Sequence, residues 1–283
     1  MSKCESNVDE LIVPELVEIP GTVSSRLAEY RDWHGDVQAD VSDLEACVSN
    51  LEIQGPSITA IDFANPCARY SEVSFELGTD VVHARLIEPA GRTRVSERVP
   101  LCLMFHDVDR PVRGWHHMTR FVAMGYAVLA LDDDVVGVGD LQRGIASPAF
   151  VERVRWGCAM AKAARELDGI DPDRLFAWGE GLGGGIALAV SALDEQGLSC
   201  ATIANPLPGG LEVLSARVRG SVLMGTSLMD TVSDPKGQFA VFNGLECDRR
   251  HIIYAKYAHE RINAFENEVV DFFNQTFYPC SLA

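Results

Sequence analysis

Three separated groups of residues in the second half of the chain could together carry out acyl-transfer chemistry. The first is a glycine-rich turn, Gly179-Glu180-Gly181-Leu182-Gly183, between an apolar run and a helix-forming segment. The other two are Asp230 and His259. A side chain on a sharp strand-to-helix turn, an aspartate and a histidine are the parts of a nucleophilic triad, in which the histidine is the general base. The order turn, acid, histidine is one of the known triad orders.

The turn has the outline of a nucleophile elbow but lacks the nucleophile. In the pattern G-x-S-x-G, outer glycines permit a tight turn and the central side chain stands at its tip. Gly179 and Gly183 fill the outer positions, which leaves Gly181 at the centre. Glycine has no side chain that could attack a carbonyl group. The covalent pathway that Asp230 and His259 would serve is therefore missing.

Two other interpretations of the turn remain open. If Glu180 were an acidic nucleophile, the bulky Trp178 and Leu182 would occupy the outer positions, where they collide, so this register is disfavoured. The glycines also match the spacing of a phosphate-binding loop at a helix N-terminus. That match is weak, because the loop 179–185 lies late in the chain and contains no lysine or arginine.

The elements around these groups alternate between strands and helices. Alternating apolar residues over 71–88 predict two half-buried strands joined by a turn at 78–80. Continuous apolar runs, typical of buried parallel strands, cover 99–105, 127–131, 174–178, 201–204, 221–225 and 252–257. Helical patterns lie between them at 116–124, 150–167, 185–193, 238–245 and 262–274. The sequence therefore predicts an α/β fold, a doubly wound, mostly parallel sheet with helices on both faces.

Length and composition favour one domain. The 283 residues, 47% of them hydrophobic, are enough for one sizeable core. Pro14, Pro20 and Gly21 predict an extended N-terminal arm over 1–33 that ends in a short helix near 23–33, followed by a single domain over 34–283. Because no signal peptide and no run of eighteen apolar residues is found, the protein is expected to be cytoplasmic.

Charge and cysteine spacing exclude several kinds of partner. The net charge of −17 is spread along the chain and disfavours nucleic acid and anionic membranes. No C-x-x-C pair or close cysteine and histidine spacing suggests a metal site. The chemistry of a nucleophilic triad needs no metal and no organic cofactor, so none is predicted.

Three segments carry a resemblance to a known family. The segment 183–193, Ser227-Leu-Met-Asp230 and Ala258-His-Glu260 resemble the motifs of the acetyl-xylan esterase and cephalosporin-C deacetylase family, carbohydrate esterase family 7 of the α/β-hydrolase superfamily. The resemblance runs from about Leu27 to the end. It implies a carboxylic-ester hydrolase (acetylesterase) that acts on an acetylated saccharide or another small ester. By this match Asp230 orients His259, the general base facing Gly181.

The chain departs from the family pattern at further positions. Asp107 and Val108 replace a glycine and a tyrosine of the family's oxyanion loop. The resemblance implies that the backbone N–H groups of Val108 and Leu182 are the oxyanion-hole donors, with the negative charge of Asp107 beside the developing oxyanion, which opposes its stabilisation. Asp134 stands where the family has an arginine. Two segments, one of them only 205–219, are shorter than in the family, and the missing parts help to shape the acyl pocket and the hexamer of family members. The resemblance therefore does not carry the pocket or the hexamer over to this chain, and it leaves homo-oligomerisation open.

The sequence thus predicts an acetyl-xylan-esterase-like domain that is catalytically impaired as a serine esterase, a pseudoenzyme, because Gly181 occupies the nucleophile position. Two alternatives remain. One is a weak or unconventional ester hydrolase in which His259 and Asp230 activate a water molecule. The other is a small-molecule or phosphate-binding protein at the glycine-rich elbow.

Overall fold

The computed structural model describes residues 40–91, 98–109 and 115–277, without the side chains of His116 and His117. These residues belong to one compact unit, Val37–Ala283. The predicted arm over 1–33 and its helix near 23–33 lie outside the described residues.

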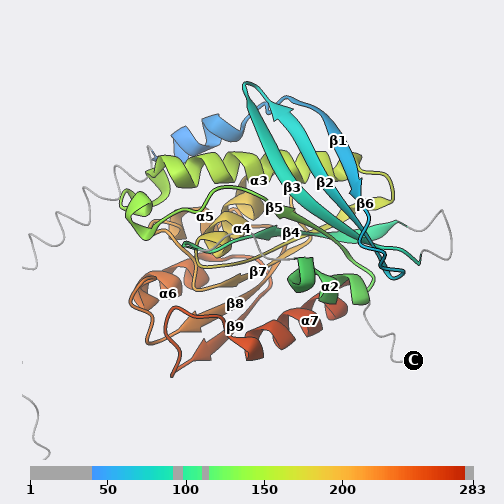
Figure 1. Cartoon of the computed structure of the whole chain (residues 1–283). Helices are drawn as coiled ribbons and strands as arrows, with labels where there is room; N and C mark the ends of the chain where they lie inside the picture. Colours follow the sequence, from blue (N-terminus) through green and yellow to red (C-terminus); the bar gives the residue numbers. More distant parts are fainter. Residues whose placement is uncertain (1–39, 92–97, 110–114, 278–283) are drawn as a thin grey trace, which may run out of the picture. The chain divides into compact units, whose positions relative to one another are not determined.

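A single sheet runs through the described part of the chain, and its nine strands follow the order β1-β2-β3-β5-β4-β6-β7-β8-β9 (Figure 1). The strands β1, β2, β3 and β5 pair antiparallel to one another, and the strands from β5 to β9 pair in parallel. The strands are β1 (Ile53–Ile61), β2 (Ala68–Leu77), β3 (Asp80–Pro89), β4 (Val99–Phe105), β5 (Ala127–Leu131), β6 (Ile170–Glu180), β7 (Cys200–Ala204), β8 (Ser221–Ser227) and β9 (Arg249–Tyr254).

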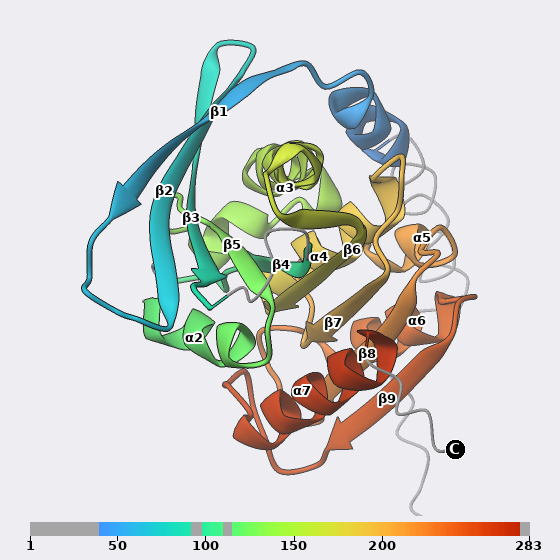
Figure 2. The ribbon, with the colours of Figure 1, turned by 90° about the vertical axis from the view of Figure 1, so that its right-hand side faces the viewer.

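Helices cover both faces of this sheet (Figure 2). One face carries α3, α4, α5 and α6, and the other carries α2 and α7. The helices are α2 (Trp115–Ala123), α3 (Pro148–Glu166), α4 (Leu182–Leu193), α5 (Glu212–Ser215), α6 (Pro235–Gly244) and α7 (Asn263–Phe277), with a further helix over 40–48 and two short 3-10 helices, η1 (Val138–Leu141) and η2 (Gly144–Ala146).

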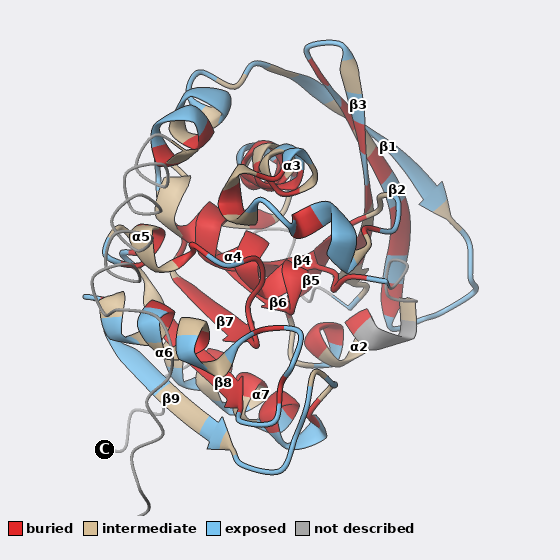
Figure 3. Ribbon diagram, turned by 90° about the vertical axis from the view of Figure 1, so that its left-hand side faces the viewer, coloured by how far each residue is buried: buried red, intermediate tan, exposed pale blue. Residues whose placement is uncertain are grey.

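The two faces bury separate hydrophobic cores because successive residues of a strand point to opposite faces. In β4, Leu101 and Leu103 belong to the core under α3 and α4, whereas Cys102 and Met104 belong to the core under α2 and α7. Figure 3 shows that the central strands and α4 are almost entirely buried, while β1 and β9 at the two edges are largely exposed. The central strands therefore hold their carboxyl ends in fixed positions.

The predicted α/β-hydrolase fold class is confirmed, with differences at the edges. The strand β1 and the helix over 40–48 were not predicted. Most residues of β1 are exposed and many are polar, so it lacks an apolar pattern. The last strand covers Arg249–Tyr254 and not the predicted 252–257, because its first residues, the exposed Arg249 and Arg250, hide its start from the apolar pattern. The helix α4 begins at Leu182, three residues earlier than predicted, since glycines there hide the start of the helical pattern.

Glycines let α4 pack directly on neighbouring backbone. A Cβ atom added at Gly183 would lie 2.4 Å from the carbonyl oxygen of Phe105, at the end of β4. A Cβ atom added at Gly185 would lie 1.6 Å from the carbonyl oxygen of Leu207. Both distances are far inside van der Waals contact. The glycine run therefore serves the close approach of α4 to the sheet and to the loop after β7.

We expect Gly183→Ala to lower the free energy of unfolding by about 2 kcal/mol, the usual cost of an overpacked core site. Gly237, in α6, is the matched control, because a Cβ atom there meets nothing within 4 Å. Gly237→Ala should leave stability unchanged or raise it by up to about 1 kcal/mol through helix propensity. Urea unfolding measures both. Equal stability of the two variants would contradict this account of the packing.

Candidate active site

The elbow that was predicted around Gly181 is a sharp turn between β6 and α4. Gly181 has φ +56° and ψ −124°, a conformation that side chains rarely adopt and that matches the strained strand-to-helix turn of a nucleophile elbow. Its N–H group donates to the carbonyl oxygen of Ala204 (2.9 Å), and its own carbonyl accepts from the N–H group of Leu207 (2.9 Å). The tip of the turn is thus residue 181, and Glu180 is the buried last residue of β6.

The carboxylate of Asp107 fills the space that a side chain at position 181 would need. A Cβ atom built on Gly181 would lie 1.6 Å from Oδ1 and 2.2 Å from Cγ of Asp107. Asp107 follows β4, the parallel neighbour of β6, and Phe105 of β4 is paired with Gly179. The carboxyl ends of these two adjacent strands therefore bring the aspartate to the elbow.

Both predicted oxyanion-hole donors bind this carboxylate. The N–H groups of Val108 (2.8 Å) and Leu182 (3.1 Å) donate to Oδ1 of Asp107. The sequence placed the charge of Asp107 beside the oxyanion hole, and the structure instead places its carboxylate within it. The reason is the missing side chain at Gly181, which leaves room for Asp107 to reach the two donors.

Asp230 and His259 lie together as the sequence predicted. His259 Nδ1 is 2.7 Å from Oδ2 of Asp230, whose side chain is fully buried. Oδ1 of Asp230 accepts from the N–H groups of Val232 and Ser233, each at 2.8 Å. Because these backbone bonds fix the carboxylate after β8, it can hold the imidazole ring in one orientation.

Backbone hydrogen bonds join the two loops that carry this pair. The N–H group of Met229 donates to the carbonyl oxygen of Tyr257, and that of Leu228 donates to the carbonyl oxygen of Tyr254. The loop after β8 is thereby tied to β9 and to the loop of His259. These backbone bonds at the end of the sheet position the loop of His259, in addition to the contacts of its side chain.

The other ring nitrogen of His259 faces Asp107. Nε2 lies 3.2 Å from Oδ2 and 3.4 Å from Oδ1 of Asp107. Burial lowers the pKa of His259, but the hydrogen bonds and charges of Asp107 and Asp230 outweigh it and raise the pKa to about 9. At neutral pH the site therefore holds an imidazolium between two carboxylates.

A buried arginine that the sequence analysis missed lies beside the acidic segment after β5. Arg153, on α3, has its Nε 2.6 Å from a carboxylate oxygen of Asp133, and its Nη2 donates to the backbone oxygen of Asp134 (3.1 Å). Asp134, at the family's arginine position, thus lies against a cation from another element. The only sequence signal was an arginine within the amphipathic pattern of α3.

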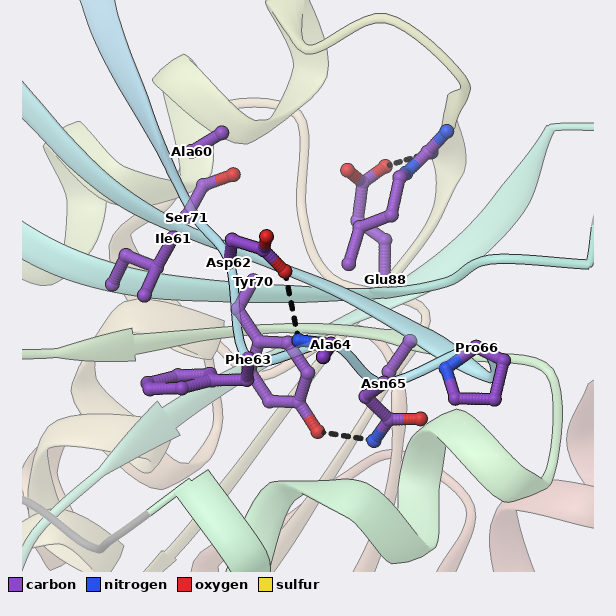
Figure 4. A pocket seen from close by; sticks show the side chains of 12 residues that line it. Ala60, Ile61, Asp62, Phe63, Ala64, Asn65, Pro66, Tyr70, Ser71 and Glu88 are labelled. Carbon is purple, nitrogen blue, oxygen red and sulfur yellow. Dashed lines mark hydrogen bonds and ion pairs between the residues drawn. The ribbon is translucent and has the colours of Figure 1, made fainter.

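The cavity that Asp107 helps to line is small. A cavity of about 10 Å³, lined in part by Asp107, Leu182 and Arg153, holds no more than a single water molecule. A larger cavity of about 480 Å³ lies at the β1–β2 connection, where the rings of Phe63 and Tyr70 meet (Figure 4). None of the predicted site residues lines that larger cavity.

The described ranges contain neither a candidate metal centre nor a membrane-spanning helix. No group of three or more histidine, cysteine, aspartate or glutamate side chains there could hold a metal ion. None of the described helices has the length and apolar character needed to cross a membrane.

The raised pKa of His259 makes stability depend on pH. The folded state keeps its proton up to about pH 9, whereas the unfolded histidine loses it near 6.5, so the contribution is complete below 6.5 and is lost as the pH rises through 9. A tenfold change in proton affinity corresponds to about 1.4 kcal/mol of stability. Urea unfolding across this range should show a loss of stability in the native protein that is absent in His259→Asn.

The matched control is His251→Asn, because burial lowers the pKa of His251 and its contribution falls at acidic pH instead. This variant should keep the loss of stability between pH 6.5 and 9. An unchanged slope in His259→Asn would show that the imidazole carries no extra proton in the folded protein.

Solved structures of esterases have the same fold. Acetyl xylan esterase 1 from Thermoanaerobacterium sp. JW/SL YS485 superposes with a TM-score of 0.72 and 18% identity, over 86% of this chain and 94% of that one. The acetyl xylan esterase from Paenibacillus sp. R4 gives a TM-score of 0.68 and 16% identity, over 83% and 93% of the two chains. Identities this low establish the fold alone.

Comparisons of the amino-acid sequence identify a relative and a family. The quorum-quenching protein AidA of Acinetobacter baumannii (strain MDR-ZJ06) is 30% identical over 161 residues, which span 51% of this chain and 52% of that protein. The chain thus matches only about half the length of this curated relative. The acetyl xylan esterase family model matches residues 41–206 and 211–276, nearly all of the described chain. The chain therefore belongs to the acetyl xylan esterase (AXE1) family.

Proposed function

We propose that this chain is an acetyl-xylan-esterase-like α/β-hydrolase domain that is impaired as a serine esterase and whose centre is rebuilt around Asp107. The observation that supports this proposal most is the Asp107 carboxylate in the space of a side chain at Gly181. A serine esterase needs a hydroxyl group at the elbow and an empty oxyanion hole. Here the first is missing, and the donors of the second bind Asp107.

The protonation state of His259 supports the same proposal. A general base must be neutral to accept a proton, whereas the pKa of His259 is raised to about 9. At neutral pH the ring is therefore an acid. The cavity that Asp107 lines, about 10 Å³, is too small to hold an acyl group. We therefore expect neither acetyl-xylan nor cephalosporin C to be hydrolysed by the serine route.

The proposed partner is a small molecule, such as an acetylated saccharide or another small ester. The net charge of −17 disfavours nucleic acid and anionic membranes. A cytoplasmic location remains a prediction from the sequence, which leaves homo-oligomerisation open.

Restoring the serine alone should fail. In Gly181→Ser the new Cβ atom meets Oδ1 of Asp107, so the variant should be inert and less stable than the native protein. The double variant Asp107→Gly, Gly181→Ser frees both the elbow and the two donors. We expect it to hydrolyse 4-nitrophenyl acetate at least about 100-fold faster than Gly181→Ser, because a nucleophile is worth far more than this in serine hydrolases.

The control for the double variant is the further change His259→Ala, which should abolish the gained activity. Circular dichroism would verify that each variant is folded. Serine-type activity in the native protein that is lost in His259→Ala would contradict the proposal. So would full activity of Gly181→Ser with Asp107 still in place.

A second candidate is a slow ester hydrolase in which His259 and Asp230 activate water. The 2.7 Å contact between these two side chains favours it. Since only a neutral imidazole can take a proton from water, the rate should rise with pH through about 9.

The measurement is 4-nitrophenyl acetate hydrolysis between pH 6 and 10, with the rate of His259→Ala subtracted as background. Asp230→Asn should lower the remaining rate, because it removes the orienting carboxylate. A flat difference across this pH range would rule out the second candidate.

A further inference from the structure

A cavity of about 190 Å³ lies between the loop after β7 and the start of α6. Residues 206–212, residues 232–234 of the loop after β8, and Gly237, Gln238 and Val241 of α6 line it. We propose that this cavity binds a small, neutral, mostly apolar molecule that carries one O–H or N–H donor. The proposal goes beyond the proposed function, because none of the predicted site residues lines this cavity.

The buried amide of Gln238 is the feature that points to a ligand. Gln238 is 1% exposed, and its Nε2 donates to the carbonyl oxygen of Ser233 (2.9 Å). Because a carbonyl can only accept, this bond assigns the nitrogen of the amide to that side and leaves the oxygen as a second polar atom. None of the described residues donates to this Oε1 atom. A buried acceptor without a donor costs free energy, so a ligand that supplies the donor is stabilised.

The remaining lining selects an apolar body for the ligand. Leu207, Leu211 and Val241 line the cavity and are buried. An apolar cavity of about 150 Å³ accommodates benzene. At about 190 Å³, this cavity has room for a ring with one polar substituent. A molecule of the size of phenol therefore fits, with its ring against the apolar side chains and its hydroxyl group on Oε1 of Gln238.

Hydrogen bonds hold the walls of the cavity in place. Oγ of Ser233 donates to the carbonyl oxygen of Pro206 (2.7 Å), which joins the loop after β8 to the loop after β7. The loop after β7 is in turn fixed to the elbow, because the N–H group of Leu207 donates to the carbonyl oxygen of Gly181 (2.9 Å). The cavity is therefore preformed, as small-molecule sites usually are.

The cavity opens to the surface and is bordered by negative charge. Gly209, Val232 and Asp234 line it and are exposed. A Cβ atom added at Gly209 or at Gly237 would meet nothing within 4 Å, so neither position is crowded. The carboxylates of Asp234 and the half-buried Glu212 also line the cavity. Their charges disfavour an anionic ligand.

The experiment titrates the ¹⁵N-labelled native protein with phenol, anisole and benzoate at neutral pH and follows the amide signals by NMR. Phenol should shift the signals of Ser233 and Gln238 saturably, with a Kd of about 1 mM or lower. Anisole has the same ring but no donor, so it should bind at least about fivefold more weakly, the factor expected for one hydrogen bond. Benzoate should not bind, because the carboxylates of the lining repel it.

A variant tests the role of the amide. Gln238→Met removes the acceptor but keeps an unbranched side chain, so it should weaken phenol binding to the level of anisole. The matched control is Gln275→Met, because Gln275 is exposed on α7 and does not line the cavity. This control should leave the Kd of phenol unchanged. Circular dichroism verifies the folding of both variants, and the comparison of phenol with anisole in the native protein needs no variant.

Two results would overturn the inference. One is the absence of saturable shifts at Ser233 and Gln238, including the case in which phenol shifts only signals near Phe63 at the larger cavity. The other is equal binding of phenol and anisole, or of phenol and benzoate, to the native protein. The acetyl-ester assay with Gly181→Ser tests the proposed function separately, and its outcome does not depend on either result.

Discussion

The site depends on one buried carboxylate and on the charges that compensate it. Asp107 accepts two backbone hydrogen bonds through Oδ1 and faces the imidazole of His259. A carboxylate that is 8% exposed is costly unless it is paired in this way. Asp107 can reach its partners only because residue 181 has no side chain. Asp107 and Gly181 therefore depend on each other. Asp107 would clash with a side chain at position 181, and Gly181 without Asp107 would leave the oxyanion hole empty.

The sheet explains why residues so far apart in sequence meet. Asp107, Gly181, Asp230 and His259 follow β4, β6, β8 and β9, and the carboxyl ends of parallel strands lie at one edge of a sheet. Two hydrophobic cores hold the central strands from both faces. The loops add only local bonds, such as those from Val232 and Ser233 to Asp230. The energy that positions the site comes from burial in the sheet and its helices.

Apolar periodicity was enough to predict the fold class, and the resemblance to the esterase family implied the pairing of Asp230 with His259. The sequence also indicated that residue 181 is the tip of the elbow, from the sizes of the residues around it. It did not indicate that Asp107 fills the elbow. That depends on the pairing of β4 with β6, which places Phe105 opposite Gly179, and no local pattern encodes such a contact. The ion pair of Arg153 with Asp133 was missed for the same reason. The exposed strand β1 was missed because it lacks an apolar pattern.

The most direct test of the central claim is the pKa of His259, measured by NMR titration of its ring in the native protein and in Asp107→Asn, with Asp109→Asn as the control. If the Asp107 carboxylate lies against the imidazole, His259 titrates near 9 in the native protein and in the control. In Asp107→Asn the value should fall toward the ordinary 6.5, because one of the two stabilising charges is gone. A native value near 6.5, or one unchanged by Asp107→Asn, would contradict the placement of Asp107 at the elbow.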